Sequence, residues 1–541
     1  MKRSLFTSSL LALLISHISH TSAAPAYGPP EILVEPSNFK GVHGLAIDRQ
    51  GRLLAGSVVG ASIYQVDIDS GQVTTLIGPD QGQADDIAIG PRGEMAWTGF
   101  YSGEILLREN DEAPIRVLAE GLPGINSIAF NQQTGQLFAS QVFLGDALWE
   151  IDPAGTQAPR QIARDLGGFN GFEVGPDGWL YGPLWFKGRV VRIDPQTGEL
   201  RTVAEGFETP AAANFDSRGT LYAVDTHAGT LVAIDPESGA TRVAARLASS
   251  LDNLAIDPQD RIFVSNMADN SIQQVDPATG SARTLTRGDL AVPAGIALSE
   301  DGARLYVTDI FAFRVVDTAT GAVRDLRRAH GSDIEYPSAV SLGRQRLLLT
   351  SFATGTLQVI SREGYATEAM IHGLQAPSAA VELPDGSVAV SELASGRILR
   401  LSGSELDSQQ ELASGLRGPV HMVLGSDGAL YVSEAAGSIS RVDPAKRQVE
   451  RVADDLAMPE GLAVTADGKL IVAETAARKL TRIDLQTGAR ETLADSLPIG
   501  LPAGPGMPPS GIPTGIAIAA DGSLYFASDL DNGLYRLRPG P

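Results

Sequence analysis

The stretch FNGFEVGPDGWLYGPLWFKGRVVRIDPQTGEL, residues Phe169–Leu200, contains the pattern from which the rest of the chain is built. Three apolar runs, GFEV, WLYG and RVVRID, are separated by the turn GPDG and the loop PLWFKG, and a second turn, PQTG, follows them. Short β-type runs broken by Gly, Pro, Asp and Asn are typical of antiparallel hairpins. The stretch therefore predicts consecutive antiparallel strands.

The turn between the first two runs recurs along the whole chain. It is found at Gly51, Gly93, Gly135, Gly178, Gly219, Asp260, Gly302, Gln345, Gly386, Gly428, Gly468 and Gly522. Successive turns lie 40 to 43 residues apart, except for the last interval of 54 residues. This is the period of a four-stranded propeller blade, and the runs lack the three- and four-residue apolar spacing of helical repeats. The long interval holds the Gly/Pro-rich segment Leu497–Pro513, for which we expect a surface loop.

Twelve blades exceed the four to eight of most propellers, and 541 residues are too many for one core. We therefore expect an all-β protein of two tandem six-bladed propellers. Glu31–Pro36 (EILVEP) resembles the fourth strand of a blade, and the chain stops after a third strand, Leu534–Arg538. We expect each ring to begin with an outer strand that completes its own last blade.

That expectation sets the domain boundaries. Ala282–Thr286 (ARTLT) would be the outer strand that opens the second ring, so the boundary falls just before it. The expected organisation is a signal peptide at 1–26, a first propeller at 27–278 and a second propeller at 279–541.

The N-terminus has the pattern of an export signal. Lys2 and Arg3 precede the apolar run Leu5–Ile18, and small residues follow at Ser22–Ala24. The alternative is an uncleaved anchor, but the apolar run is short and is interrupted by Ser and His. We expect a periplasmic or secreted protein that has no membrane contact after cleavage.

Composition excludes several classes of function. The net charge of −22 opposes electrostatic binding to nucleic acid or to an anionic membrane surface. The chain has no cysteine, so neither disulfides nor thiolate chemistry are possible. The sequence also lacks a G-x-S-x-G nucleophile motif, a phosphate-binding Gly-rich loop and the Cys/His spacing of zinc sites.

The positions at the start of the first strand of each unit distinguish the two rings. In a propeller these strands surround the central channel, so their starts meet on one face. In units one to six the residues are His43, Asp85, Asn126, Asn170, Ala211 and Asp252. In units seven to twelve they are Ala294, Ser338, Ser378, Val420, Glu460 and Thr514. Only the first ring is rich in groups that bind metals or transfer protons.

Carboxylate and amide oxygens that converge on a channel mouth suit Ca²⁺, Mg²⁺ or Mn²⁺, and His43 also allows Zn²⁺. We expect one divalent metal in the first propeller, with Asp252, Asp85 and His43 as the candidate catalytic residues. The alternative is that these polar residues only bind water or cap strands.

The ends of the second strands supply candidate substrate contacts. Tyr101, Trp185, Lys187 and His227 lie there, and together with Asn126 they suit a small polar organic substrate. The alternative for each aromatic residue is packing between blades.

The corresponding ends in the second ring are acidic: Asp309, Glu392, Glu434, Glu474 and Asp529. These residues could bind a second cation, but we favour solvation of that face. A protein partner could bind through the second propeller.

The units GFEVGPDGWLYGPLWFKGRVVRIDPQTG (171–198) and EGLAVTADGKLIVAETAARKLTRIDLQTG (460–488) resemble the senescence marker protein/gluconolactonase family of six-bladed propellers, which is regucalcin-like. They are also similar to NHL-type and virginiamycin B lyase-like repeats. The resemblance implies a lactonase with one divalent metal held by a Glu, an Asn and an Asp, the Asp also serving as general base. Asn170 and Asp252 match the family Asn and Asp, whereas His43 stands in place of the first-blade Glu. The metal ligands implied here are thus Asn170, Asp252 and His43.

Three functions follow from these observations. The first is metal-dependent hydrolysis of lactones or related esters in the first propeller. The second is a metal-assisted lyase in which His43 or His227 removes a proton. The third is a non-catalytic binding scaffold, because a fold does not dictate a function.

Overall fold

The computed structural model describes residues 27–507, 510 and 512–540, so the expected signal peptide lies outside the described residues. The described residues form 48 β-strands and one 3₁₀ turn, Thr475–Ala477. The strands make twelve four-stranded antiparallel sheets, which confirms the all-β fold of twelve blades. No helix among the described residues is long and apolar enough to cross a membrane.

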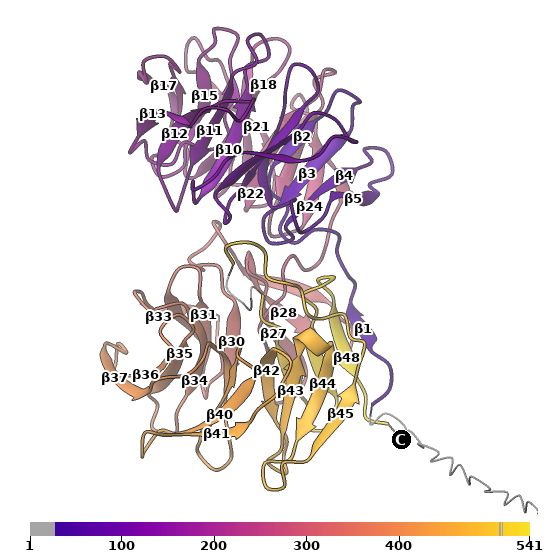
Figure 1. Ribbon diagram of the computed structural model, residues 1–541, viewed down its shortest axis with the longest axis vertical. Coiled ribbons are helices and arrows are strands. Elements are labelled where there is room, and N and C mark those ends of the chain that lie inside the picture. Colours follow the sequence, from indigo (N-terminus) through magenta and orange to yellow (C-terminus); the bar gives the residue numbers. More distant parts are fainter. Residues whose placement is uncertain (1–26, 508–509, 511, 541) are drawn as a thin grey trace, which may run out of the picture.

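The first six sheets follow the chain without interruption and form the first propeller (Figure 1, indigo to magenta). Their strands are β2 (Leu45–Ile47), β3 (Leu53–Ser57), β4 (Ser62–Val66), β5 (Val73–Ile77); β6 (Ala84–Ile89), β7 (Met95–Gly99), β8 (Glu104–Arg108), β9 (Arg116–Ala119); β10 (Ile125–Phe130), β11 (Leu137–Gln141), β12 (Ala147–Ile151), β13 (Arg160–Arg164); β14 (Glu173–Val174), β15 (Leu180–Leu184), β16 (Arg189–Ile193), β17 (Leu200–Glu205); β18 (Pro210–Phe215), β19 (Leu221–Asp225), β20 (Thr230–Ile234), β21 (Thr241–Arg246); and β22 (Leu251–Ile256), β23 (Ile262–Asn266), β24 (Ser271–Val275), β25 (Ala282–Thr286).

The other six sheets form the second propeller (Figure 1, pink through orange to yellow, with β1 in indigo). Their strands are β26 (Ile296–Leu298), β27 (Arg304–Thr308), β28 (Ala312–Asp317), β29 (Val323–Arg328); β30 (Ala339–Leu342), β31 (Arg346–Ser351), β32 (Thr356–Ser361), β33 (Thr367–Ile371); β34 (Pro377–Glu382), β35 (Val388–Glu392), β36 (Arg397–Ser402), β37 (Ser408–Ala413); β38 (Pro419–Leu424), β39 (Leu430–Glu434), β40 (Ser438–Asp443), β41 (Gln448–Ala453); β42 (Pro459–Val464), β43 (Leu470–Glu474), β44 (Lys479–Ile483), β45 (Arg490–Ala494); and β46 (Ile516–Ile518), β47 (Leu524–Ala527), β48 (Leu534–Leu537), β1 (Glu31–Val34).

Each set of six blades closes into a ring. The innermost strands of successive blades pack beside one another, and the ring closes where β22 packs against β2 and where β46 packs against β26. The second strand of each blade in the first propeller is buried along its whole length, because neighbouring blades cover both faces of its sheet. The predicted turns also form: Gly178 and Asp260 adopt positive φ values of 80° and 59°, which Gly and Asp tolerate better than most residues.

The outer strands are exchanged differently from our expectation. β1 pairs with β48, so it completes the last blade of the second propeller, and β25 completes the sixth blade of the first. The boundary predicted between residues 278 and 279 therefore falls inside a sheet and is wrong. Both segments have the pattern of an outer strand, but that pattern does not specify which edge the strand joins. The first propeller is continuous in sequence, and the second takes its closing strand from the other end of the chain.

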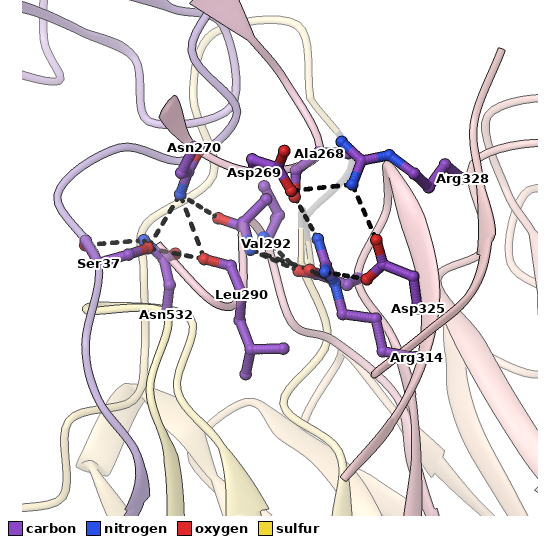
Figure 2. Close-up of polar contacts among 12 residues, drawn as sticks. Ser37, Ala268, Asp269, Asn270, Leu290, Val292, Arg314, Asp325, Arg328 and Asn532 are labelled. Atoms are coloured by element: carbon purple, nitrogen blue, oxygen red, sulfur yellow. Dashed lines mark hydrogen bonds and ion pairs between the residues drawn. The ribbon is translucent and has the colours of Figure 1, made fainter. Parts of the chain in front are cut away.

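The chain crosses between the propellers twice, after β1 and after β25, and buried side chains tie these crossings together (Figure 2). The amide of Asn270, in the first propeller, donates to Ser37 Oγ (2.9 Å) and to the carbonyl of Ala291 (3.0 Å). Asn532, in the second propeller, donates to the same Ser37 Oγ (3.1 Å). Two amides from different rings thus share one hydroxyl on a crossing segment.

A second set of contacts uses arginines of the second propeller (Figure 2). Arg314 is buried, pairs with Asp309 at 2.7 Å and also donates to the carbonyl of Ala268 in the first propeller. Arg328 pairs with Asp269 of the first propeller at 2.9 Å. Charged hydrogen bonds in a buried setting fix the geometry of both partners, so the two rings meet in a defined arrangement.

Candidate functional site

A cavity of about 400 Å³ lies between the two propellers and is lined by side chains from both. The first propeller contributes the strand starts that the sequence singled out: His43, Asp85, Asn126, Asn170 and Asp252. The second contributes mainly apolar and aromatic side chains, among them Ile310, Phe311, His330, Tyr336, Phe352, Met507 and Ile512. The channel mouth of the first ring is therefore covered by the second ring.

His43, Asp85 and Asp252 form the polar floor of this cavity. His43 precedes β2, while Asp85 lies in β6 and Asp252 in β22, so ring closure brings blades one, two and six together here. His43 Nδ1 lies 3.2 Å from Asp252 Oδ2 and 3.4 Å from Asp85 Oδ1. All three side chains are largely buried, with 10 to 15% of their surface exposed. The sequence placed these three residues correctly on one face.

The charges of this cluster depend on each other. Burial lowers the pKa of His43, but the charge and hydrogen bond of Asp252 and the charge of Asp85 outweigh burial and raise that pKa overall. Burial raises the pKa of Asp85, against the opposing effect of the charge on His43. Both shifts favour the protonated forms of His43 and Asp85.

The donor atoms of the cluster fit a divalent ion. One nitrogen and two carboxylate oxygens lie within 4.8 Å of one another. Ligand atoms at about 2.0 Å from a tetrahedral ion are about 3.3 Å apart, which is close to the separations from His43 Nδ1. The set of one imidazole and two carboxylates suits Zn²⁺ or Mn²⁺ better than the all-oxygen sites of Ca²⁺.

Asn170 and Asn126 line the same cavity but have other partners. Asn170 Oδ1 accepts from Gly171 N (3.0 Å) and lies 2.8 Å from the hydroxyl of Ser127. Both contacts lie within the first propeller, and Asn170 remains a predicted ligand beside the cluster. The amide of Asn126 donates to Asp85 Oδ2, which orients that carboxylate.

Eight rings from both propellers line up around the cavity, and we call them the aromatic belt. Adjacent rings have centroids 5.0 to 6.3 Å apart and meet edge to face. In order, they are Tyr101, Phe100, Phe143, Trp185, His330, Tyr336, Phe311 and His43. Tyr101 and Trp185 are therefore placed at the cavity, as the sequence predicted. The alignment missed Phe311, His330 and Tyr336, because positions within one ring carry no signal of contact with another ring.

Backbone strain is concentrated around the same cavity. Phe143, Ile310, His330 and Tyr336 have φ values of 68°, 43°, 60° and 48°, in the left-handed region that bulky residues rarely adopt. Such residues cost about 1–3 kcal/mol each and persist only where the surrounding structure holds them. His330 Nε2 lies 2.5 Å from the hydroxyl of Tyr336, and burial lowers the pKa of His330 to about 4, so this pair is neutral at neutral pH.

Two predicted substrate contacts are not brought to the cavity. Lys187 is exposed and does not line it. His227 is also outside, with its Nε2 3.2 Å from Glu208. Both residues follow the second strand of a blade, but neither side chain lines the cavity.

The acidic strand ends of the second ring are structural. Asp309, Glu392, Glu434, Glu474 and Asp529 are at most 4% exposed, so our expectation that they are solvated is wrong. Each accepts a backbone N–H from the preceding connection, as Glu392 does from Gln375 and Asp529 from Gly500. The segment Leu497–Pro513 also differs from a plain surface loop, because its Met507 and Ile512 line the cavity.

Comparison with known proteins gives one family match. Residues 419–540 match the SMP-30/Gluconolactonase/LRE-like region. No curated protein matches the chain significantly. Among solved structures, a catalytically inactive virginiamycin B lyase from Staphylococcus aureus with quinupristin is 16% identical, covers 46% of this chain and 94% of its own, and has a TM-score of 0.36. The matched residues confirm the resemblance to SMP-30/gluconolactonase-like propellers, and they lie in the second propeller, whereas the His43 cluster lies in the first.

Proposed function

We propose that the protein hydrolyses small lactones or related esters in the cavity between its propellers, using a divalent cation held by His43, Asp85 and Asp252. The observation that carries this proposal is the convergence of three ligand atoms on the floor of a mostly apolar cavity between the two rings. When bound there, the cation would polarise the substrate carbonyl and reduce the cost of negative charge on its oxygen.

The two carboxylates of the cluster differ in their hydrogen-bond partners and therefore in their suitability as a general base. Asp85 is oriented by Asn126, so it serves to hold the cluster together. Asp252 contacts His43, and no other hydrogen bond to its side chain is formed by the described residues. It is therefore the better candidate to accept a proton from the attacking water. The belt surrounds the substrate and limits access of other water.

Metal analysis of the purified protein tests the first half of this proposal. We expect about one divalent ion per chain, lost together with activity when a chelator is added. A lactone and ester panel then tests the reaction: hydrolysis adds the mass of water to the product. A product without added water would indicate a lyase, and a full rate after complete metal removal would contradict the metal-dependent mechanism.

We also propose that the protein is exported and loses its first 23 to 26 residues. The charged, apolar and small residues of the N-terminus support this. Mass spectrometry of the protein from its native host should find a mature chain that begins between residues 24 and 27. An intact Met1 would contradict it.

A further inference from the structure

We propose that the substrate has a bulky, uncharged and apolar body, preferably aromatic, and that the second propeller selects this body through Phe311 and Tyr336. The inference rests on the proposed function for the reaction, but its own basis is the shape and chemistry of the cavity wall. It replaces the small polar substrate that the sequence suggested.

The charges that line the cavity argue against an anionic body. Its only carboxylates are Asp85 and Asp252 on the floor, and no lysine or arginine is among its lining residues in the described chain. A cation bound on the floor would neutralise the two carboxylates. A substrate body with its own negative charge would then have no partner in the wall.

The wall also argues against a polyhydroxylated body such as a sugar lactone. Most of it consists of aromatic and aliphatic side chains, including Phe100, Phe143, Phe352 and Met507. The hydroxyl of Tyr336 is already bonded to His330. Most hydroxyls of a sugar would exchange water for an apolar surface, which is unfavourable unless the hydroxyl finds a partner.

The aromatic belt suits an apolar substrate body instead, because it surrounds the cavity with the faces and edges of aromatic rings. Neighbouring belt rings already pack edge to face, so an aromatic guest can continue the same arrangement. The volume of about 400 Å³ is within the range of sites for small organic ligands.

The second propeller completes this site. Phe311 packs against His43 of the floor at 5.6 Å between ring centroids, and Tyr336 packs against Phe311 at 5.9 Å. Without these two rings, the belt is interrupted between His330 and His43. Phe311 is 4% exposed, and the backbone of Tyr336 is held in the left-handed region, so both rings are preorganised before a ligand binds.

The test compares kcat/KM of the full mature protein for three δ-lactones: the unsubstituted ring, an aryl-substituted ring and a sugar lactone. We expect the aryl lactone to exceed the sugar lactone by at least about tenfold. Phe311→Leu and Tyr336→Leu, which keep an apolar side chain, should lower kcat/KM for the aryl lactone about tenfold more than kcat/KM for the unsubstituted lactone.

Phe186→Leu is the matched control, because Phe186 is 59% exposed and does not line the cavity. Should a belt variant fail to fold, Phe352→Ala takes its place, since Phe352 is only partly buried. Equal rates on sugar and aryl lactones, or belt variants that behave like the control, would overturn the proposal.

Equilibrium dialysis with the corresponding aryl lactam separates this inference from the proposed reaction. The lactam should bind the unmodified protein and bind Phe311→Leu about tenfold more weakly. If the lactam binds in this way but no lactone or ester is hydrolysed, the apolar site is retained and the hydrolase is rejected. If the lactam does not bind and the sugar lactone is hydrolysed, the hydrolase is retained and the apolar site is rejected.

Discussion

In the first propeller, most of the innermost strands begin with a carboxylate, amide or imidazole side chain, and these side chains meet at a cavity. In the second propeller, four of the six strands begin with a small or aliphatic residue: Ala294, Ser338, Ser378 and Val420. Even where the second ring has an acid, its role differs. Glu460 accepts from Ser510 Oγ at 2.7 Å and from Thr514 N at 2.6 Å, so both its oxygens have partners. Among the described residues, Asp252 forms an ion pair with His43 alone, and it lines the cavity. At this position, Glu460 of the second ring thus has a hydrogen-bond donor on each oxygen, whereas Asp252 of the first ring faces the cavity.

The largest effect should come from deleting residues 27–36, which contain β1. This deletion removes one of four strands from the last blade of the second propeller and leaves the first propeller complete. We expect the second ring to lose cooperative unfolding while the first retains it. Expression of residues 37–288 alone should give a folded ring, measured by circular dichroism and calorimetry.

A fragment of residues 288–541 should not fold unless a peptide of residues 27–36 is supplied. If the fragment folds cooperatively without that peptide, the pairing of β1 with β48 is dispensable and the two rings are more alike than their topology indicates.

Next in size is the comparison of Asp252→Ala with Glu460→Gln. Loss of an anionic ligand and candidate base should remove bound metal and lower kcat/KM about 1,000-fold, or about 4 kcal/mol. Glu460→Gln should keep both metal and activity, because its partners lie within the second ring. Metal content and steady-state rates measure this. The reverse outcome would place the site in the second propeller.

A smaller effect is expected at the contact between the rings. Arg314→Leu leaves Asp309, which is fully buried, without its charged partner, and should lower the free energy of unfolding by about 3 kcal/mol. Urea denaturation measures this. The control is Arg441→Leu, whose partner Asp427 is exposed and whose loss should cost less than about 1 kcal/mol. Equal effects of the two variants would show that Arg314 and its buried contacts do not secure the interface.

The smallest effect concerns pH. Burial raises the pKa of Glu460 from 4.5 to about 7. The folded state then binds more protons than the unfolded state between these values, so stability should fall as pH rises from 4.5 to 7. Glu460→Gln removes this loss and should therefore stabilise the protein at pH 8, with little change at pH 4.5. Thermal unfolding at both pH values is the measurement, and parallel curves for the two proteins would contradict it.

The sequence predicted the features that depend on local pattern. Turn residues such as Gly178 and Asp260 marked every blade, and the first position of each innermost strand located His43, Asp85 and Asp252. Partners that lie far away in the chain could not be read in this way. The pattern of β1 is satisfied equally by either ring, and Phe311 and Tyr336 reach the cavity only because the rings face each other.

The pairing of β1 with β48 has a consequence for the order in which the molecule can be completed. Glu31 in β1 accepts from Arg536, 505 residues further along the chain. The first ring has all its strands once β25 has been synthesised, whereas the second ring needs the first strand and the last strand together. Its closure therefore waits for the whole chain, and the unpaired edge of β1 stays open to other strands until then. The cavity, which needs both rings, is the last part of the protein to form.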